Sequence, residues 1–136
     1  MFEGWSAEAA RAFCERWLPA WTGNDPERLL SFYAADAFYS DPAVPLGLLG
    51  RERLMDYFRR LLAAYPEWVW THRRSLPLRD GFLNFWDARL DASETSPRWS
   101  GVCVVQIGRG LIIRNEVFMD RSAMPRPTGG GRAAGS

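Results

Sequence analysis

Two carboxylates stand where predicted strands end, the positions from which a side chain can reach a cavity. Asp41 closes a short predicted strand over residues 37–40, and the following Pro42 prevents that strand from continuing. A carboxylate held there among apolar segments is suited to general acid–base catalysis. The alternative is structural, because an Asp in a turn often accepts a hydrogen bond from a nearby backbone N–H. Asp41 is therefore the first candidate catalytic residue, with turn capping as the competing interpretation.

The second carboxylate, Asp120, ends the last predicted strand. Side chains alternate between the two faces of a strand, so the residues before Asp120 divide into an odd and an even set. The odd set is the more apolar and is predicted to line the cavity: Ile113, Asn115, Val117 and Met119. The even set is predicted to face outward, where a partner subunit could pair its charges: Arg114, Glu116 and Phe118. Asp120, less constrained at the strand end, is the second candidate catalytic residue.

The residue types exclude several chemistries. All 17 basic residues are arginine, so no lysine is present to form a Schiff base, anchor pyridoxal phosphate or bind a nucleotide phosphate in a Walker loop. One histidine, His72, and two distant cysteines, Cys14 and Cys103, offer no metal-ligand cluster. Both thiols fall at apolar positions and are predicted to be buried and reduced. A metal site made of carboxylates alone is the remaining alternative, and no sequence pattern indicates one. We therefore predict no metal and no cofactor.

Charge and hydropathy limit the partners. A net charge of +1 provides no field to attract nucleic acid or an anionic membrane surface. No window approaches about eighteen consecutive apolar residues, so no membrane-spanning helix is predicted. The first residues lack the basic and apolar segments of a secretory signal. The remaining prediction is a cytoplasmic protein whose partners are a small hydrophobic ligand and a second copy of itself.

Hydropathy patterning divides the chain into a helical first half and a stranded second half. Apolar spacing predicts a helix capped by Ser6 and running to residue 21, with a kink or an early end at Pro19. A short second helix opens at Pro26, includes Tyr33 and stops near Ala35. A third helix is predicted over residues 51–64, and a period of two predicts strands over residues 67–76, 82–90, 98–107 and 111–121.

This order predicts one α+β domain with a pocket. The chain has 136 residues, enough for a single core, and residues 1–124 carry the patterned segments. Residues 125–136 are rich in Pro, Gly, Ala, Ser and Arg and are predicted to form a disordered tail. Helices gathered early and an antiparallel sheet gathered late favour helices packed on one concave face of a bent sheet. Such a bend leaves room for a ligand.

Several segments carry a family resemblance. They are Phe-Tyr-Ala-Ala-Asp-Ala-Phe-Tyr-Ser-Asp-Pro at residues 32–42, Gly-Arg-Glu-Arg-Leu at residues 50–54, Trp86, and the last strand from Gly110 to Asp120. Together with the element order they resemble the SnoaL-like members of the nuclear transport factor 2-like superfamily, over residues of about 8 to 122. The resemblance implies a cone-shaped α+β barrel with three helices packed on a curved, mostly antiparallel sheet. The superfamily contains ketosteroid isomerases, polyketide cyclases, epoxide hydrolases, dehydratases and non-catalytic binding modules.

The resemblance also implies roles for particular residues. In ketosteroid isomerases an Asp in the similar Asp-Pro turn takes a proton from carbon next to a carbonyl, and Asp41 matches it. In those isomerases a Tyr and a neutral Asp donate hydrogen bonds to the oxyanion that forms during the reaction. Trp17 occupies the position that matches this Tyr, and the position of the neutral Asp falls at or near Ser100. The predicted substrate-binding residues are Trp17, Tyr33, Phe58, Ser100, Asn115 and Met119.

Three functions follow from these observations. The first is binding of a small apolar molecule, with Asp41 as general acid–base of a cofactor-free isomerisation, cyclisation or dehydration and with Tyr33 and Trp17 as polar positioning groups. The second is a non-catalytic ligand-binding or dimerisation module, favoured by the changed donors at Trp17, Phe58 and Ser100. The third is water addition to an epoxide, which requires Arg114 to bridge Asp41 and Asp120.

Overall fold

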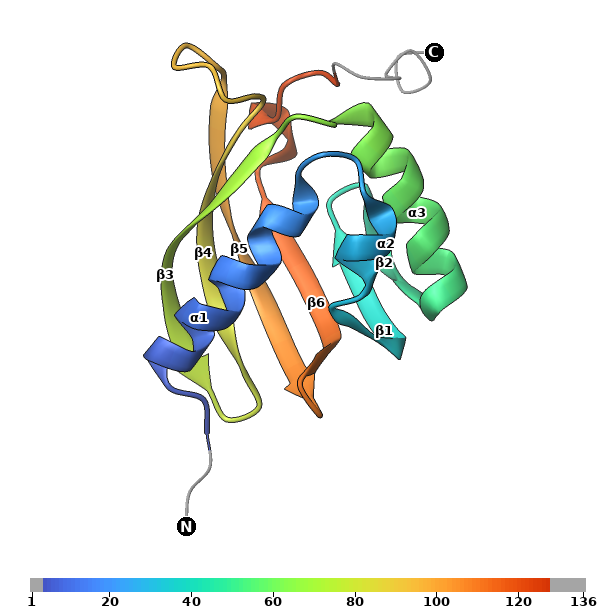
Figure 1. Ribbon diagram of the computed structural model, residues 1–136, viewed down its shortest axis with the longest axis vertical. Coiled ribbons are helices and arrows are strands. Elements are labelled where there is room, and N and C mark those ends of the chain that lie inside the picture. The colour runs from blue at the N-terminus through green and yellow to red at the C-terminus, as the bar shows by residue number, and fades with distance from the viewer. Residues whose placement is uncertain (1–3, 128–136) are drawn as a thin grey trace.

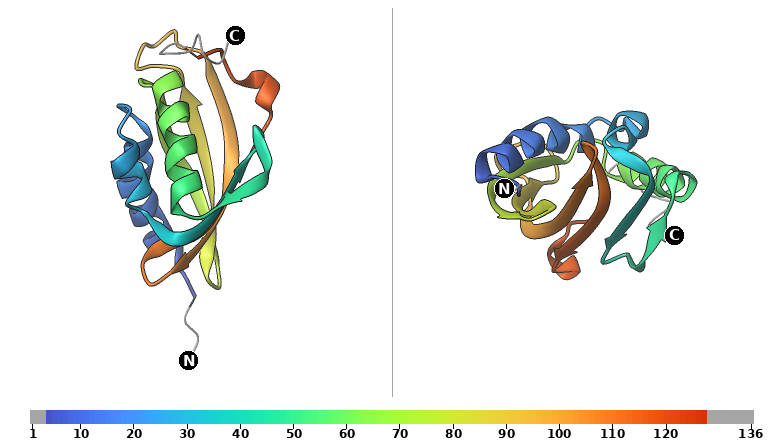
Figure 2. Two further views of the ribbon diagram at one scale, coloured as in Figure 1. Left: turned by 90° about the vertical axis from the view of Figure 1, so that its right-hand side faces the viewer. Right: turned by 90° about the horizontal axis from the view of Figure 1, so that it is seen from below.

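Three helices cover one face of a curved, open six-stranded sheet in a computed structural model that describes residues 4–127 (Figure 1). The strands lie in the order β2-β1-β6-β5-β4-β3. β1 and β6 are parallel, and every other neighbouring pair is antiparallel. Seen along the strands, the sheet curves around the side on which the helices lie (Figure 2). The predicted α+β class and helix-covered curved sheet are confirmed.

The helices and strands have the following bounds. The helical elements are α1 (Ala7–Trp17), a 3₁₀ turn η1 (Leu18–Trp21), α2 (Pro26–Leu30), α3 (Arg51–Ala64) and a 3₁₀ turn η2 (Arg121–Ala123). The strands are β1 (Tyr33–Asp41), β2 (Val44–Leu49), β3 (Val69–Leu78), β4 (Gly81–Arg89), β5 (Arg98–Gly108) and β6 (Leu111–Met119).

The first helix begins and ends as predicted. The Ser6 hydroxyl accepts a hydrogen bond from the Ala9 backbone N–H at 3.0 Å and so caps α1. Pro19 has no backbone N–H to continue the α-helical ladder, and the chain tightens into η1 at Leu18. The early end puts Trp21 on a separate short turn, which later matters for the site.

The second helix is shorter than predicted. The prediction that it includes Tyr33 and stops near Ala35 is wrong, because α2 ends at Leu30 and Tyr33 already begins β1. Tyr33 pairs with Ile112 of the parallel strand β6. The helical spacing of these residues is therefore overridden by a strand partner that lies far away in the sequence.

Strand β2 was not predicted at all. It contains Pro45 and Gly47, residues that argue against a central strand. The strand is tolerated because it is the edge of the sheet, where an absent N–H disrupts no inner ladder. Gly47 is required, since its φ is +91° and a Cβ there would lie 2.1 Å from the Phe38 ring.

The prediction for the faces of the last strand is right for most of its length. Asn115 and Val117 are buried, and Met119 is half-buried, so this part of the odd set faces the helices. Ile113 is the exception at 39% exposure. The β5–β6 register shifts between Gln106 and Ile107, and this irregularity moves Ile112 to the inside in place of Ile113.

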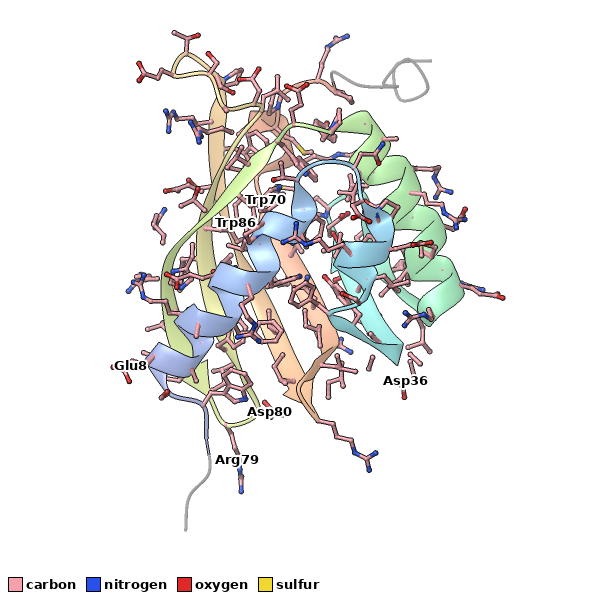
Figure 3. All side chains as sticks on the ribbon, viewed as in Figure 1. Glu8, Asp36, Trp70, Arg79, Asp80 and Trp86 are labelled. Atoms are coloured by element: carbon pink, nitrogen blue, oxygen red, sulfur yellow. The ribbon has the colours of Figure 1, made fainter. Side chains whose placement is uncertain are left out.

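Aromatic side chains fill much of the interior. Trp70 and Trp86 lie next to each other between the sheet and α1 (Figure 3), with ring centroids 4.2 Å apart. Cys14 and Cys103 are buried free thiols, and burial raises the pKa of Cys14 to about 12. No helix in the described part of the chain has both the length and the apolar character needed to cross a membrane.

Part of the predicted C-terminal tail contacts the domain. The Pro125 carbonyl accepts a hydrogen bond from the Tyr65 hydroxyl at 3.1 Å, and Pro127 lies against the cavity described below. The rest of the predicted tail, residues 128–136, lies outside the described residues.

Candidate functional site

The carboxylate of Asp41 accepts four hydrogen bonds at the end of β1. Oδ1 accepts from the backbone N–H groups of Ala43 at 2.8 Å and Val44 at 3.1 Å, which closes the turn into β2. Oδ2 accepts from the hydroxyls of Tyr39 and Tyr57, both at 2.7 Å. The residue is 7% exposed. One oxygen therefore caps a turn while the other faces two phenols, so the two interpretations of Asp41 describe different atoms of one side chain.

The two phenols are fixed donors toward Asp41. Burial raises the pKa of the Tyr39 and Tyr57 hydroxyls well above the ordinary tyrosine value, and the charge of Asp41 raises both further. Both hydroxyls are therefore protonated at neutral pH and direct their single proton to Oδ2. Their remaining lone pairs can only accept. The polar wall around Asp41 thus offers acceptors to an incoming molecule.

A cavity of about 240 Å³ opens beside this group. Its wall comes from η1, the end of β1, α3, β3, the end of β6 and the segment after β6. Six aromatic side chains line it: Trp21, Tyr39, Tyr57, Tyr65, Trp68 and Trp70. Most of the remaining wall is aliphatic, and the charged side chains in it are Asp41, Arg60 and Arg121. An apolar cavity of about 150 Å³ is large enough to hold benzene, so this one suits a fused bicyclic molecule.

The wall is held by hydrogen bonds between segments distant in sequence. The Trp68 indole N–H donates to the Trp21 carbonyl and the Thr22 hydroxyl donates to the Trp68 carbonyl, both at 2.6 Å. These two bonds fix η1 to the chain that enters β3. The ring of Trp21 then stacks on that of Trp70, with centroids 5.3 Å apart and planes 28° apart. The tight turn that follows Pro19 therefore positions one aromatic wall.

Two indole donors of the cavity wall have no partner. The Nε1 atoms of Trp21 and Trp70 are buried and make no hydrogen bond to any described residue. A buried donor left unpaired costs roughly 1–3 kcal/mol relative to a bonded one. Both nitrogens are covered by neighbouring atoms, so an acceptor on a bound molecule reaches them only if an indole ring turns. The polar atoms offered near Asp41 are therefore acceptors, and the indole donors of the wall are not available without such a movement.

Four of the predicted substrate-binding residues lie together in the core instead of the cavity wall. Asn115 Nδ2 donates to the Tyr33 hydroxyl at 3.0 Å, and both residues are at most 1% exposed. Phe58 packs against the Tyr33 ring, with centroids 5.4 Å apart, and Trp17 makes an edge contact with the same ring at 6.4 Å. Burial raises the pKa of Tyr33, so its hydroxyl is a neutral internal partner of Asn115.

Ser100 lies on the outer face of the sheet. Its hydroxyl donates to the Asp87 carboxylate at 2.7 Å, and Asp87 also pairs with Arg73 at 3.2 Å. The neighbouring Trp99 is buried on the helix side. Strand alternation therefore turns Ser100 to solvent, away from the cavity that its predicted substrate-binding role would require.

Met119 and Asp120 differ although they are adjacent. Met119 lines the cavity, as well as an adjoining hollow of about 200 Å³ that shares Asp41. Asp120 is exposed and accepts from the backbone N–H and the hydroxyl of Ser122, which lowers the pKa of its carboxyl. Arg114 packs over the Phe38 ring at 4.1 Å and pairs with Glu116. Arg114 therefore bridges no pair of cavity carboxylates, and the arrangement required for epoxide hydrolysis is not present.

Tyr39 and Tyr57 were missed by the sequence analysis, although weak signals existed. Tyr39 precedes Asp41 by two residues on the same strand, so alternation puts both on one face. Tyr57 precedes Leu61 by one helical turn, and both line the cavity from α3. Among residues 4–127, no three His, Cys, Asp or Glu side chains come together as metal ligands.

Comparisons with known proteins identify the family to which this chain belongs. A family model described as the SnoaL-like domain matches residues 14–115. No curated protein matches the sequence. Among solved structures, a SnoaL-like protein of unknown function from Burkholderia thailandensis has a TM-score of 0.72 and 19% identity, covering 87% of this chain and 99% of that one. A protein from Mycobacterium tuberculosis has a TM-score of 0.71 and 17% identity, covering 89% and 98%.

A third similar structure has a bound small molecule. It is a hypothetical protein with a ketosteroid isomerase-like fold from Catenulispora acidiphila, in complex with trimethylamine. Its TM-score is 0.68 and its identity 20%, and the match covers 82% of this chain and 87% of that one. At such sequence identities the similar structures show only that the fold is shared, whereas the family model matches most of the sequence. The chain therefore belongs to the SnoaL-like domain family, with the ketosteroid isomerase-like fold of the nuclear transport factor 2-like superfamily.

Proposed function

We propose that this protein binds a small, mostly apolar carbonyl compound in the cavity beside Asp41 and moves a proton on it without a cofactor. The observation that carries the proposal is a buried carboxylate, fixed by Tyr39 and Tyr57, in the wall of an aromatic cavity of about 240 Å³. In this proposal Asp41 is the general acid–base of an isomerisation, cyclisation or dehydration. Tyr39 and Tyr57 take the positioning role that the sequence analysis gave to Tyr33 and Trp17.

The wall supplies what such a reaction needs. Removing a proton next to a carbonyl leaves negative charge on oxygen, and this charge is stabilised by donors already in place. In this proposal the indole ring of Trp21 or Trp70 turns its unpartnered and now buried N–H toward the bound oxygen. A bound apolar molecule displaces water from the cavity, which strengthens the hydrogen bonds to Asp41 and to the developing negative charge. Catalysis by Asp41 requires one of the four bonds to its carboxylate to yield during proton transfer.

Deuterium exchange tests the proposal without knowledge of the natural substrate. The probe is 2-tetralone, a bicyclic ketone with acidic protons next to its carbonyl, incubated in heavy water and followed by NMR. We expect the wild-type protein to accelerate exchange and Asp41→Asn to lose roughly 10²–10⁴-fold of that acceleration. Asp36→Asn is the matched control, because Asp36 is an exposed carboxylate on the same strand, as Figure 3 shows.

Binding and exchange are measured on the same samples. If 2-tetralone binds the wild type and exchanges no faster than in buffer, the catalytic half of the proposal is wrong. If Asp41→Asn binds the ketone and exchanges as fast as wild type, Asp41 is not the base. Failure of a thermal-shift screen of apolar bicyclic compounds to find any stabilising ligand would remove the binding half as well.

A second candidate is ligand binding without catalysis. The observation that favours it is the saturation of Asp41, whose four hydrogen bonds occupy the usual lone-pair positions of a carboxylate. Such a group serves as a fixed counter-charge, and aromatic rings beside it attract a cation. A small ammonium ligand would suit this combination, and the related Catenulispora acidiphila structure holds trimethylamine. Binding of tetramethylammonium with no ketone exchange would select this candidate.

We further propose that the protein is a homodimer formed through the outer face of the sheet. Phe118 is 51% exposed there, and Arg114 and Glu116 precede it at alternate positions of the same strand face. An exposed aromatic ring beside paired charges is a composition found in interfaces. Sedimentation equilibrium of the wild type and Phe118→Glu tests this, since the added charge would dissociate such a dimer. The cytoplasmic location stays a prediction of the sequence.

A further inference from the structure

The cavity that contains Asp41 also has two cationic side chains in its wall. Arg60 lies on α3, and its guanidinium is 2.7 Å from the Asp56 carboxylate, with both side chains mostly exposed. Arg121 follows β6 and forms no ion pair within the described residues 4–127. One acidic and two basic groups therefore share a single cavity, and one of the basic groups is without a carboxylate partner.

The charges of both arginines reach the cavity. The pKa of the Tyr57 hydroxyl is raised by burial and by Asp41, and Arg121 and Arg60 oppose that rise. Burial also raises the pKa of Tyr65, and Arg121 opposes this as well. Tyr57 is hydrogen bonded to Asp41 and at the same time lies within the field of the two arginines. The wall of this one cavity therefore carries charges of both signs.

Arg121 is carried by a segment that is tied down on both sides. Before it, Asp120 accepts from the N–H and the hydroxyl of Ser122 at 3.0 and 2.7 Å. After it, the Met124 N–H donates to the Arg121 carbonyl at 3.1 Å, and the Pro125 carbonyl accepts from Tyr65. Met124 lines the cavity from the same segment. These hydrogen bonds make Asp120 a positioning residue for the segment that carries Arg121, a role separate from proton transfer.

We propose that the ligand of this cavity carries a carboxylate, held by Arg121 with support from Arg60, while its uncharged end is directed to Asp41. The inference rests on the proposed small-molecule site and specifies its substrate class as aromatic or polycyclic carboxylic acids. The orientation follows from Coulomb's law, because Asp41 repels the carboxylate that the two guanidinium groups attract. The aromatic rings of the cavity wall pack against the apolar part of the ligand, whichever way its carboxylate points.

A matched pair of probes tests this by isothermal titration calorimetry. 1-Naphthaleneacetate and 1-naphthaleneacetamide have nearly the same shape and differ in charge. We expect the acid to bind about threefold to tenfold more tightly at low ionic strength, with the preference falling as salt is added. Arg121→Gln is expected to remove most of the preference and Arg60→Gln a smaller part. Arg79→Gln is the control, since Arg79 is exposed at the lower end of the molecule in Figure 3, whereas the segment after β6 that carries Arg121 lies near the upper end in Figure 1.

The positioning role of Asp120 has its own readout. Asp120→Ala removes the acceptor for Ser122 and is expected to lower the ratio of acid affinity to amide affinity, since Arg121 bears on the acid alone. Asp120→Asn keeps an acceptor oxygen and is expected to restore most of the preference.

The outcomes separate this inference from the function on which it rests. Equal affinity for acid and amide, or a preference that survives Arg121→Gln, overturns the carboxylate inference and leaves the apolar site in place. If neither probe binds while other uncharged bicyclic compounds do, the carboxylate inference also fails. If no bicyclic compound binds at all, the proposed site itself is wrong.

Discussion

The space between the helices and the sheet divides into a filled half and an open half built from similar residues. Near Tyr33, rings and the Asn115 amide pack to exposures of 1% or less. Near Asp41, rings of the same kinds surround a cavity of about 240 Å³. In the filled half the Asn115 amide N–H donates to the Tyr33 hydroxyl while the amide Oδ1 has no partner among the described residues, whereas in the open half two phenols converge on one carboxylate. Aromatic content alone therefore does not decide whether an interior is a core or a pocket.

The helices lie over different parts of the sheet. α1 lies across the sheet over β3 and β4 and covers it closely, whereas α3 lies beside the β1–β2 edge (Figure 1). The wall at that edge is completed by single turns, namely η1, the Asp41 turn and η2 with its following residues. Short turns hold side chains in place without filling the volume between them. The following predictions test this contrast, ordered by the size of the change that we expect.

Two neighbouring leucines of α3 provide the first test. Leu62 is fully buried, so Leu62→Ala is expected to lower the free energy of unfolding by about 2–5 kcal/mol. Leu61 lines the cavity, and Leu61→Ala, which enlarges an existing space, is expected to cost about 1 kcal/mol. Urea denaturation measures both. Equal losses would mean that the cavity is closed in solution and that the contrast is wrong.

Removing a hydroxyl should act on stability in one half and on function in the other. Tyr33→Phe leaves the buried Asn115 Nδ2 without its acceptor and is expected to cost about 1–3 kcal/mol, with ketone exchange unchanged. Tyr57→Phe removes one donor from Asp41 and is expected to alter ligand affinity or exchange, with a stability change below about 1 kcal/mol. Urea denaturation and 2-tetralone exchange are read on both variants. If Tyr33→Phe impaired deuterium exchange and Tyr57→Phe lowered stability instead, the roles assigned to the two halves would be wrong.

Alkaline pH should weaken the fold. Burial raises the pKa of all four tyrosines, Tyr33, Tyr39, Tyr57 and Tyr65, above the value of 10.0 of the unfolded chain. Their stabilisation is fully present below pH 10 and is lost as the pH rises above it, because the unfolded chain then releases protons that the native protein retains. The expected slope is about 1.4 kcal/mol per pH unit for each tyrosine still protonated in the native state. Urea denaturation at increasing pH, with phenolate absorbance recorded, measures it. Phenolate formation at pH 10 in the native protein would contradict the burial of Tyr33 and Tyr39.

The smallest effect is expected on the outer face. Ser100→Ala removes an exposed hydrogen bond to Asp87 and is expected to change the free energy of unfolding by no more than about 0.5 kcal/mol. Ligand affinity is expected to stay at the wild-type value, as calorimetry would measure. A loss of ligand affinity would mean that Ser100 contributes to the binding site and that its strand face does not point to solvent.

Local signals made much of the fold predictable. Ser6 and Pro19 set the limits of α1, and the spacing over residues 51–64 matches α3 residue for residue. The long strands of the second half were found within two residues of their ends because they pair with neighbours in sequence. The first part of β1 was taken for helix because its partner, β6, is distant in sequence. No local pattern carries that information.

The candidate site was only half predictable for a related reason. Asp41 could be found because Asp and Pro in succession mark a turn at a strand end, a local chemical signal. Tyr57 could not be joined to it, since that requires knowing where α3 lies relative to β1. Trp17, Tyr33, Phe58 and Asn115 have the right chemistry for a pocket, and their packing around the Tyr33 ring placed them in the core.

Local patterns in the amino-acid sequence were enough to indicate the family, most of the helices and strands, and a carboxylate at the end of a strand. Those properties depend on spacing and turn chemistry, which are local and survive in any arrangement of the elements. The folded arrangement was needed to show which polar side chains contact that carboxylate, which aromatic rings leave space beside it, and that Arg121 lines the same cavity. Such contacts depend on the relative placement of segments distant in the chain, and that placement is set by the packing of the whole molecule.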